Sequence, residues 1–373
     1  MNSADAVAAV VRALEPIKEL AVDVEADAMH AFRARLCYVQ LGTDEDVWLL
    51  DTLAEGVKAA PLAAFFGDPS RTKFFHAAGG DLQYLAEAGV RVKGLFDTHR
   101  AATLLGWPKV GLADLVLEKL GVKLTKEHQQ SDFSLRPPPP GMRDYIADDV
   151  RYLCDVGRIV REACKAAGLD EEIELDCQRL ADEAAERPDP LNDFKPKVNR
   201  SGMAPATVAV AEKVARELHA LRLKWAEAQD VPFGRVLSNA AVTAVSSKQP
   251  DNLKDLARCE GVHGRLVREH GDEILALIAG WKKKSAEGQL PPAEAKPPVD
   301  RDRKKREDQL IDWRKARAAE RKITPSAVLP NPLVDELATR PPKSLEELKL
   351  VKYFGEKRVG LYGKQLLDLL AGR

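Results

Sequence analysis

The stretch LAVDVEAD, Leu20–Asp27, alternates acidic and apolar residues and decides the fold of the N-terminal part of the chain. Asp23, Glu25 and Asp27 are separated by single apolar residues, and alternate residues of a β-strand point to the same face of a sheet. The three carboxylates would therefore lie side by side. Like charges on one face repel each other, and partial burial adds a desolvation cost. Such a strand needs a compensating interaction; we expect Asp27 to be solvated or to lie behind the other two.

The sequence around this stretch predicts an α/β domain with a mixed central sheet flanked by helices. Three segments are typical of short strands or strand ends: CYVQLG (Cys37–Gly42), DVWLLDTL (Asp46–Leu53) and KFFHAAGG (Lys73–Gly80). Helical patterns lie between and after them, at Pro61–Phe66, Asp81–Ala88, Thr98–Leu105, Leu112–Leu120 and from Met142 to about Ala167. Strands mixed with helices in this way indicate a sheet covered by helices.

The C-terminal part of the chain contains an internal repeat of helical character. Shifting the sequence by 92 residues without a gap aligns identical apolar and turn residues, namely Val236/Val328, Leu237/Leu329, Asn239/Asn331, Pro250/Pro342, Leu253/Leu345, Leu256/Leu348, Gly271/Gly363, Leu275/Leu367, Leu277/Leu369 and Gly280/Gly372. The repeat spans about 210–282 and 307–372. We therefore predict a first domain at 1–200, two all-α domains at 201–282 and 307–373, and a Pro-rich, charged linker at 283–306.

The length and charge of the chain agree with several domains. A chain of 373 residues is long for a single core. Its net charge of −1 hides an asymmetry, because residues 1–200 carry 25 Lys and Arg against 34 Asp and Glu, whereas residues 283–373 carry 21 against 14. The acidic N-terminal part of the chain can carry reactive carboxylates, while the basic C-terminal part can attract a polyanion.

The sequence also predicts where the protein resides. No segment reaches the roughly 18 unbroken apolar residues of a membrane helix, and the N-terminus lacks the basic start and apolar core of a secretory signal. The five cysteines are scattered, and none are spaced as CxxC, which argues against a disulfide framework or a zinc site. We therefore expect a cytoplasmic protein that does not associate with membranes. Without coiled-coil heptads, we expect a monomer.

Carboxylates are the residues that can carry the chemistry. The phosphate loop GxxxxGK[ST], the zinc motif HExxH and the nucleophile elbow GxSxG are absent from the sequence. Asp81 follows a predicted strand at the start of a helix, and Asp149 comes four residues after Tyr145 on the predicted helix from Met142, so Tyr145 and Asp149 share a helix face. Carboxylates that converge at the end of a sheet would bind Mg²⁺ or Mn²⁺. Two such ions about 3.5–4 Å apart can clamp both oxygens of a phosphoryl displacement, and a tyrosine hydroxyl can orient the attacking water.

These segments resemble a known family. DVEAD (Asp23–Asp27), HAAGGDL (His76–Leu82) and YIADDVRYL (Tyr145–Leu153) resemble, in order, the three exonuclease motifs of the DEDD superfamily in its tyrosine-bearing branch, with the closest similarity to the ribonuclease D family. Three connecting segments are also similar to that family: LFDTHRAATLLGW (Leu95–Trp107), LEKLGVKLTKE (Leu117–Glu127) and QSDFSLRP (Gln130–Pro137). The two C-terminal repeats resemble HRDC domains, which are small helical nucleic-acid-binding modules.

The resemblance implies an RNase H-like fold for the first domain and 3′→5′ hydrolysis of single-stranded RNA ends. It also implies the release of nucleoside monophosphates and a role in trimming tRNA precursors and other stable RNAs. Matched residue by residue, it assigns two Mg²⁺ or Mn²⁺ ions to a set of four ligands, Asp23, Glu25, Asp81 and Asp149, and a catalytic role to Tyr145. The chain departs from the family at Phe133, where tryptophan is usual, at Pro138–Pro140 and at Ala28, none of which is an implied ligand.

Four further residues are candidates for contacts with the substrate. Met29, His30 and Phe32 could line a pocket for the terminal base, where stacking tolerates any sequence; ordinary packing explains them equally well. His76 lies close in sequence to Asp81, and a packed or hydrogen-bonded histidine is the alternative interpretation. No small-molecule organic cofactor is expected.

Two other functions stay open at the level of the sequence. DNA exonucleases use the same acidic set, and the discrimination of RNA requires contacts to the ribose 2′-hydroxyl that a sequence does not reveal. A metal-free RNA-binding scaffold is the second alternative. The presence of Asp23, Glu25, Asp81, Tyr145 and Asp149 argues against it.

Overall fold

The computed structural model describes residues 1–125, 128, 130–186, 191, 194, 195, 197, 198, 201–290 and 300–372. The chain divides into two compact units. The first contains Met1–Ala26, Leu36–Arg187 and Val299–Arg373, and the second contains Asp27–Arg35 and Pro188–Pro298. The N-terminal α/β domain therefore shares a unit with the second helical repeat, whereas the first repeat belongs to the other unit.

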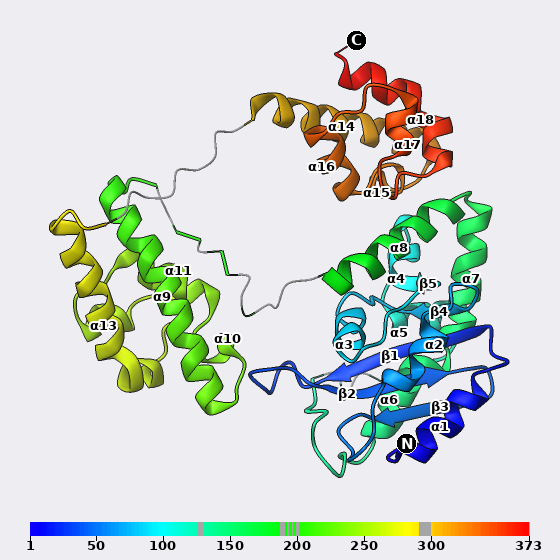
Figure 1. The fold of residues 1–373 in the computed structure, drawn as a ribbon, viewed down its shortest axis with the longest axis horizontal. Coiled ribbons are helices and arrows are strands. Elements are labelled where there is room, and N and C mark those ends of the chain that lie inside the picture. Colours follow the sequence, from blue (N-terminus) through cyan, green and yellow to red (C-terminus); the bar gives the residue numbers. More distant parts are fainter. Residues whose placement is uncertain are drawn as a thin grey trace. The chain divides into compact units, whose positions relative to one another are not determined.

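A five-stranded mixed sheet forms the centre of the α/β domain (Figure 1). In the described part of the chain its order is β3–β2–β1–β4–β5, with β1 at Glu19–Ala26, β2 at Leu36–Gly42, β3 at Val47–Asp51, β4 at Thr72–Phe75 and β5 at Leu95–Asp97. The central strand β1 pairs antiparallel with β2 and parallel with β4. Its apolar residues, among them Val22 and Val24, are buried, and this burial favours strand formation despite the acidic residues between them. The mixed central sheet predicted from the sequence is confirmed.

Helices surround this sheet and contribute to its core. They are α1 (Ala4–Ala13), α2 (Ala63–Phe66), preceded by a 3₁₀ turn (Ala60–Leu62), α3 (Asp81–Glu87), α4 (Thr98–Leu104), α5 (Leu112–Leu120), α6 (Met142–Arg151), α7 (Leu153–Ala166) and α8 (Asp170–Glu186). α6 packs on β1, β2 and β3, α7 on β1 and β4, and α8 on β5. At Gly157 of α7 a Cβ atom would lie 2.3 Å from the ring of Phe74, so the absence of a side chain lets the helix approach the sheet.

Some predicted boundaries differ from the structure. The helix predicted from Met142 to about Ala167 is two helices, because Tyr152 leaves helical geometry with φ −110° and ψ 0°. α6 and α7 pack on different sets of strands. The break between them allows each helix to align with the strands on which it packs. The strand predicted at Lys73–Gly80 ends at Phe75, where the chain turns toward α3. The short strand β5 and the helices α1 and α8 were not predicted.

The second helical domain contains five helices in the described residues: α14 (Arg301–Arg321), α15 (Pro325–Val328), α16 (Asn331–Thr339), α17 (Leu345–Lys349) and α18 (Glu356–Leu370). It has its own core, which includes Leu310, Leu337, Phe354 and Leu366. Ala327 of α15 belongs to the core of the α/β domain, and Ile323 packs against both cores, so the two domains share buried apolar surface.

Polar contacts join α18 of the second helical domain to α8. Glu171 of α8 accepts hydrogen bonds from the backbone N–H groups of Glu356 and Lys357, both at 2.9 Å, and so caps the first turn of α18. Gly355, which precedes α18, has φ +87°, and a Cβ there would lie 2.5 Å from Leu175. Glycine is required for both reasons. The Lys357 ammonium donates to Glu172 at 2.8 Å.

The first helical domain lies in the second unit. Its helices are α9 (Pro205–Gln229), α10 (Phe233–Val236), α11 (Asn239–Lys248), α12 (Leu253–Ala257) and α13 (Gly264–Ala286), and its core includes Leu218, Trp225 and Ile274. The predicted linker at 283–306 is helical at both ends, because α13 continues to Ala286 and α14 begins at Arg301 behind the capping residue Asp300. Residues 291–299 of this linker lie outside the described residues. The predicted domain boundaries stay predictions.

Among the described residues, no helix combines the length and the apolar character needed to cross a bilayer.

Candidate active site

Strand β1 brings two predicted ligands to one face of the sheet. Asp23 and Glu25 are partly buried, while Val22 and Val24 between and beside them are buried, as the alternation in the sequence requires. The pairing of β1 with β2 shifts register between Glu25 and Ala26. The two carboxylates therefore lie just before the point where regular pairing ends.

The turn after β4 brings Asp81 to the start of α3. Ala77 in this turn has φ +63°, a left-handed conformation that non-glycine residues rarely adopt. The buried carboxylate of Asp97 holds the turn, because it accepts hydrogen bonds from the backbone N–H groups of Ala77 at 3.1 Å and Ala78 at 2.9 Å. Asp97 thereby fixes the path of the chain from His76 to Asp81.

Helix α6 contributes Tyr145 and Asp149, which lie one turn apart. Tyr145 packs against a small cluster that contains Tyr38, Phe133 and Met142. Phe133, which stands where the family usually has tryptophan, is thus a packing residue of the cluster that Tyr145 contacts. The apolar contacts of this cluster determine which face of α6 is turned toward the interior, and this orients Tyr145 and Asp149.

Three of the four predicted ligands meet in space. One carboxylate oxygen each from Asp23, Glu25 and Asp149 can be chosen so that all lie within 4.8 Å of one another. They line a pocket of about 380 Å³ together with Tyr145 and His76. Asp81 is outside this triad, but its charge contributes to the raised pKa of both Asp23 and Glu25, which indicates that it lies near them.

The pocket suits a hard divalent cation. Its acidic groups offer oxygen donors only, as Mg²⁺ and Mn²⁺ prefer. Within the described ranges, no Lys, Arg or His forms an ion pair with Asp23, Glu25 or Asp149. Three clustered carboxylates without a cationic side chain repel each other, and a bound metal ion would offset that repulsion. These three residues, joined by Asp81, are therefore the side chains that could hold a metal.

The pKa values of the four carboxyl groups are raised by burial and by the neighbouring negative charges. Burial, followed by the charges of Asp23 and Asp149, raises the pKa of Glu25 to about 10. Burial, followed by the charge of Asp23, raises the pKa of Asp149 to about 8, and burial with the charge of Asp97 raises the pKa of Asp81 to about 7. The pKa of Asp23 is raised well above its usual value, mainly by burial and then by Asp81.

Tyr145 and His76 are both electrically neutral near pH 7. Burial, and then the charges of Asp149 and Glu25, raise the pKa of the Tyr145 hydroxyl, which therefore keeps its proton. Burial, and then the charge of His99, lower the pKa of His76 to about 4. The pocket thus offers one hydroxyl donor and one neutral imidazole beside the carboxylates.

The predicted contacts for the terminal base belong to the other unit. Met29 is exposed, and one ring nitrogen of His30, Nε2, is buried without a hydrogen-bond partner. Phe32 packs against the core of the first helical domain, and its backbone N–H donates to Asp230 at 3.2 Å. The substrate contacts proposed for these residues stay predictions. Asp27, which we expected to be solvated or to lie behind the other two, is fully buried and pairs with Arg35 at 2.7 Å.

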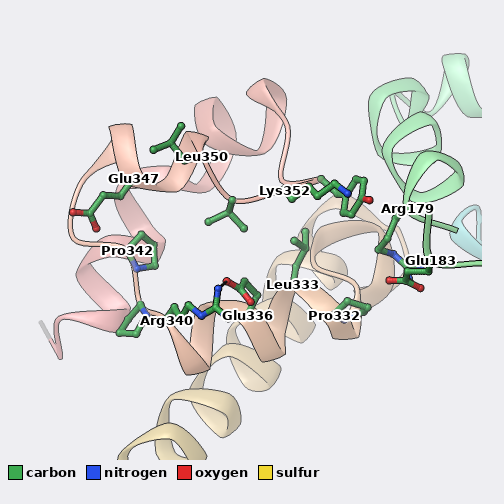
Figure 2. A pocket seen from close by; sticks show the side chains of 13 residues that line it. Arg179, Glu183, Pro332, Leu333, Glu336, Arg340, Pro342, Glu347, Leu350 and Lys352 are labelled. Atoms are coloured by element: carbon green, nitrogen blue, oxygen red, sulfur yellow. Dashed lines mark hydrogen bonds and ion pairs between the residues drawn. The ribbon is translucent and has the colours of Figure 1, made fainter. Parts of the chain in front are cut away.

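A larger groove, of about 620 Å³, lies elsewhere in the first unit (Figure 2). Arg179 and Glu183 of α8 line one side of it, and residues of the second helical domain line the rest. Several of its charged groups are paired, for example Arg179 with Glu183 at 2.6 Å and Arg340 with Glu336 at 3.4 Å. The smaller pocket, with unpaired carboxylates, is therefore the better candidate for catalysis.

Asp97 is a functional residue that the sequence reasoning missed. It was part of a segment noted only for its resemblance to the family. A local signal existed, because an aspartate between an apolar run and a helical pattern is typical of an N-cap, and Asp97 does accept a hydrogen bond from the Arg100 N–H at 3.0 Å. Its second role, holding the turn at Ala77, depends on a strand pairing that sequence does not reveal.

Comparisons with known proteins identify the family. The model of the 3′-5′ exonuclease family matches residues 1–163, and the HRDC domain model matches residues 211–278 and 303–370. The chain is 30% identical over 309 residues to a ribonuclease D of Acidiphilium cryptum, with 80% of this chain and 77% of the relative aligned. It belongs to the ribonuclease D family.

Other ribonuclease D proteins are also similar to this chain. That of Gluconacetobacter diazotrophicus is 32% identical over 266 residues, which cover 70% of this chain and 66% of the relative. The crystal structure of ribonuclease D from Escherichia coli, an exoribonuclease, aligns with all of this chain and 98% of its own with a TM-score of 0.70 at 23% identity, which shows a common fold. The protein is accordingly a hydrolase, a 3′→5′ exoribonuclease whose exonuclease family depends on divalent metal.

Proposed function

We propose that this ribonuclease D hydrolyses the terminal phosphodiester bond of RNA at the pocket to which β1 contributes Asp23 and Glu25 and α6 contributes Tyr145 and Asp149, and releases nucleoside monophosphates. The carboxylate cluster of Asp23, Glu25 and Asp149 carries this proposal. Asp81 completes the set, and the four residues hold two divalent ions, Mg²⁺ or Mn²⁺. Bound divalent ions supply positive charge that stabilises the negative charge developing on the phosphate.

The side chains of the pocket have separate tasks in this mechanism. Asp23, Glu25, Asp81 and Asp149 would hold the cations. The Tyr145 hydroxyl, protonated at neutral pH, holds the attacking water through a hydrogen bond and orients it toward the phosphorus. The packing of Tyr145 against the apolar cluster that contains Phe133 supports this role.

The substrate is the 3′ end of single-stranded RNA, and tRNA precursors and other stable RNAs are the physiological class that we propose. The relatives are ribonuclease D proteins, and the Escherichia coli protein is described as acting in structured RNA processing. The enzyme works as a monomer in the cytoplasm. Both HRDC domains guide the RNA through phosphate contacts, which carry no sequence information.

Digestion of labelled RNA tests the proposed function. A single-stranded RNA labelled at its 5′ end should shorten one nucleotide at a time, whereas the same RNA labelled at its 3′ end should release labelled mononucleotide first. Both reactions should require Mg²⁺ or Mn²⁺ and stop in EDTA. Loss of label from the 5′ end first, or equal rates in EDTA, would exclude the proposal.

A further inference from the structure

His76 lines the pocket, and the mechanism leaves its hydrogen bonding unused. Its Nδ1 lies 2.9 Å from the hydroxyl oxygen of Thr98, and that hydroxyl lies 2.9 Å from the carbonyl oxygen of Phe75. The ring also packs edge-on against His99, with centroids 5.5 Å apart. The imidazole is therefore held on one side by a short hydrogen-bonded chain and on another by a second ring.

This chain of contacts assigns the proton on the imidazole. The carbonyl oxygen of Phe75 can only accept, so the single hydroxyl proton of Thr98 is donated to it. The Thr98 oxygen can then only accept from the imidazole, which places the ring proton on Nδ1. In a neutral imidazole the other nitrogen, Nε2, is then a bare acceptor.

The acceptor Nε2 is available to a ligand. His76 lines the pocket with Asp23, Glu25 and Tyr145. Within the described ranges, Nε2 has no hydrogen-bond partner in the protein. It is also absent from the buried polar atoms that lack a partner, so it remains accessible. The turn that carries it is fixed by the hydrogen bonds from Ala77 and Ala78 to Asp97. The acceptor is thus preorganised at the site where the substrate binds.

The chemistry of an acceptor beside a scissile phosphate restricts its partner. A phosphate oxygen is itself an acceptor and carries negative charge, so it does not bind a bare imidazole nitrogen. The nearest donors on the substrate are the hydroxyl groups of the two riboses that the scissile phosphate joins. Of these, only the 2′-hydroxyl distinguishes RNA from DNA.

We propose that Nε2 of His76 accepts a hydrogen bond from the 2′-hydroxyl of a ribose flanking the scissile phosphate, and that this contact favours RNA over DNA. The inference rests on the proposed function, because it requires the phosphate to bind at the carboxylate cluster. Thr98 is the positioning residue, since its hydroxyl fixes the proton on Nδ1. Specificity for the sugar thus depends on a histidine tautomer.

The test compares an all-ribose single-stranded RNA with two versions that carry a single 2′-deoxynucleotide, one at the last position and one at the position before it. For the wild-type enzyme, one of these substitutions should lower kcat/KM about tenfold, as the loss of one hydrogen bond in a binding site does. His76→Phe keeps a ring of similar size but has no acceptor. It should digest the all-ribose and the deoxy substrates at equal rates.

Two further variants separate this role from a merely structural one. His76→Gln can place an amide oxygen near the position of Nε2 and should restore part of the preference. Thr98→Val keeps the shape of the side chain but removes the hydroxyl, so Nδ1 of His76 loses its acceptor. The preference for ribose should then fall, although Thr98 itself does not contact the substrate.

The outcomes distinguish the inference from the function on which it rests. An unchanged preference for the all-ribose substrate in His76→Phe, with the variant folded by circular dichroism, would overturn the inference alone. Digestion by the wild-type enzyme that proceeds equally in EDTA would overturn the proposed function. Equal wild-type rates on all three substrates in Mg²⁺ would leave the function intact and exclude the ribose contact.

Discussion

Two groups of carboxylates in the first unit, one buried and one partly buried, have opposite electrostatic surroundings. On α8, Asp176 pairs with Arg100 at 2.5 Å and with Arg179 at 2.8 Å, and Glu172 pairs with Lys357 at 2.8 Å. At the end of β1, Asp23 and Glu25 lie beside other carboxylates, and no ion pair with a cationic side chain of the described residues compensates them. Folding provides cationic partners for the carboxylates of the first group, whereas the carboxylates of the second group depend on a cation that binds.

The difference teaches how a structural acid is distinguished from a functional one. A buried carboxylate with a cationic partner or several N–H donors is stabilised in the folded chain itself. A buried carboxylate surrounded by others is held in place only because the rest of the fold is stable enough to bear the cost. Exchange of a carboxylate for an amide should therefore remove activity in one group and weaken domain packing in the other.

Asp149→Asn should produce the largest effect on catalysis. The amide removes one negative charge from the cluster and weakens the binding of a divalent cation, so kcat should fall at least about 10³-fold, in line with the loss of a main electrostatic contribution. Asp148→Asn is the matched control, because Asp148 is its neighbour in sequence and pairs with Arg151 at 2.9 Å. Its rate should stay within about twofold of wild type in Mg²⁺. Full activity of Asp149→Asn would remove Asp149 from the site.

Tyr145→Phe should give the next largest effect. The ring and its packing against the apolar cluster that contains Phe133 are kept, but the hydroxyl that we propose to hold the water is lost. General acid–base and water-orienting groups contribute about 10²-fold or more, so the single-turnover rate should fall about 100-fold while RNA binding changes little. A single-turnover rate equal to that of wild type would contradict the water-positioning role.

The carboxylate cluster could be predicted from the sequence because its signals are local. Alternation in LAVDVEAD places Asp23 and Glu25 on one face, and the spacing of four residues places Tyr145 over Asp149. The structure brings Asp23, Glu25 and Asp149 together, as these patterns and the resemblance to the family implied.

The features that could not be predicted depend on contacts between distant segments. Asp97 reaches Ala77 and Ala78 only because β5 pairs with β4, and the three residues of β5 are too few to show a periodic pattern. The burial of Asp27 depends on Arg35 from beyond a turn. The packing of the second helical domain on α8 is also non-local. In sequence, the charges of α8 resemble an ordinary solvated helix face.

The two repeats show how small changes create that packing. In the first domain His263 caps α13 itself, since its ring accepts from the Leu266 N–H at 3.1 Å. The residue 92 positions later is Gly355, which cannot cap, and Glu171 of α8 supplies the missing acceptor for α18. In the first domain, Arg265 of α13 pairs with the exposed Glu269. The residue 92 positions later, Lys357 of α18, pairs instead with the buried Glu172.

Lys357→Met should therefore loosen the second helical domain. The change leaves Glu172, which is 1% exposed, without its closest cationic partner, and a hydrogen bond to a charged group contributes about 1.5–3 kcal/mol. Amide hydrogen exchange in α8 and α18 should become roughly 10- to 100-fold faster. Arg265→Met is the matched control in the first repeat, and because its ion pair is exposed the exchange of α13 should change little. Unchanged protection of α18 in Lys357→Met would show that apolar contacts alone hold the domain.

The smallest effect concerns the stability of the metal-free protein. Because the pKa of Glu25 is raised from 4.5 to about 10 and that of Asp149 from 3.8 to about 8, the folded state holds protons at neutral pH that the unfolded state has already released. Folding is then favoured less as pH rises, and the loss is complete only above the folded pKa values. In EDTA the melting temperature should fall by several degrees between pH 6 and pH 9.

Mg²⁺ separates this effect from other pH-dependent changes. A cation bound to the cluster stabilises the ionised carboxylates, so saturating Mg²⁺ should flatten the fall in melting temperature. Asp149→Asn has one titrating acid fewer and should melt higher than wild type at pH 9 in EDTA, although it is inactive. Glu172→Gln on α8, where the carboxylate is paired with Lys357, should instead melt lower. If both amide variants shifted the melting temperature in the same direction, the distinction between the two groups of carboxylates would fail.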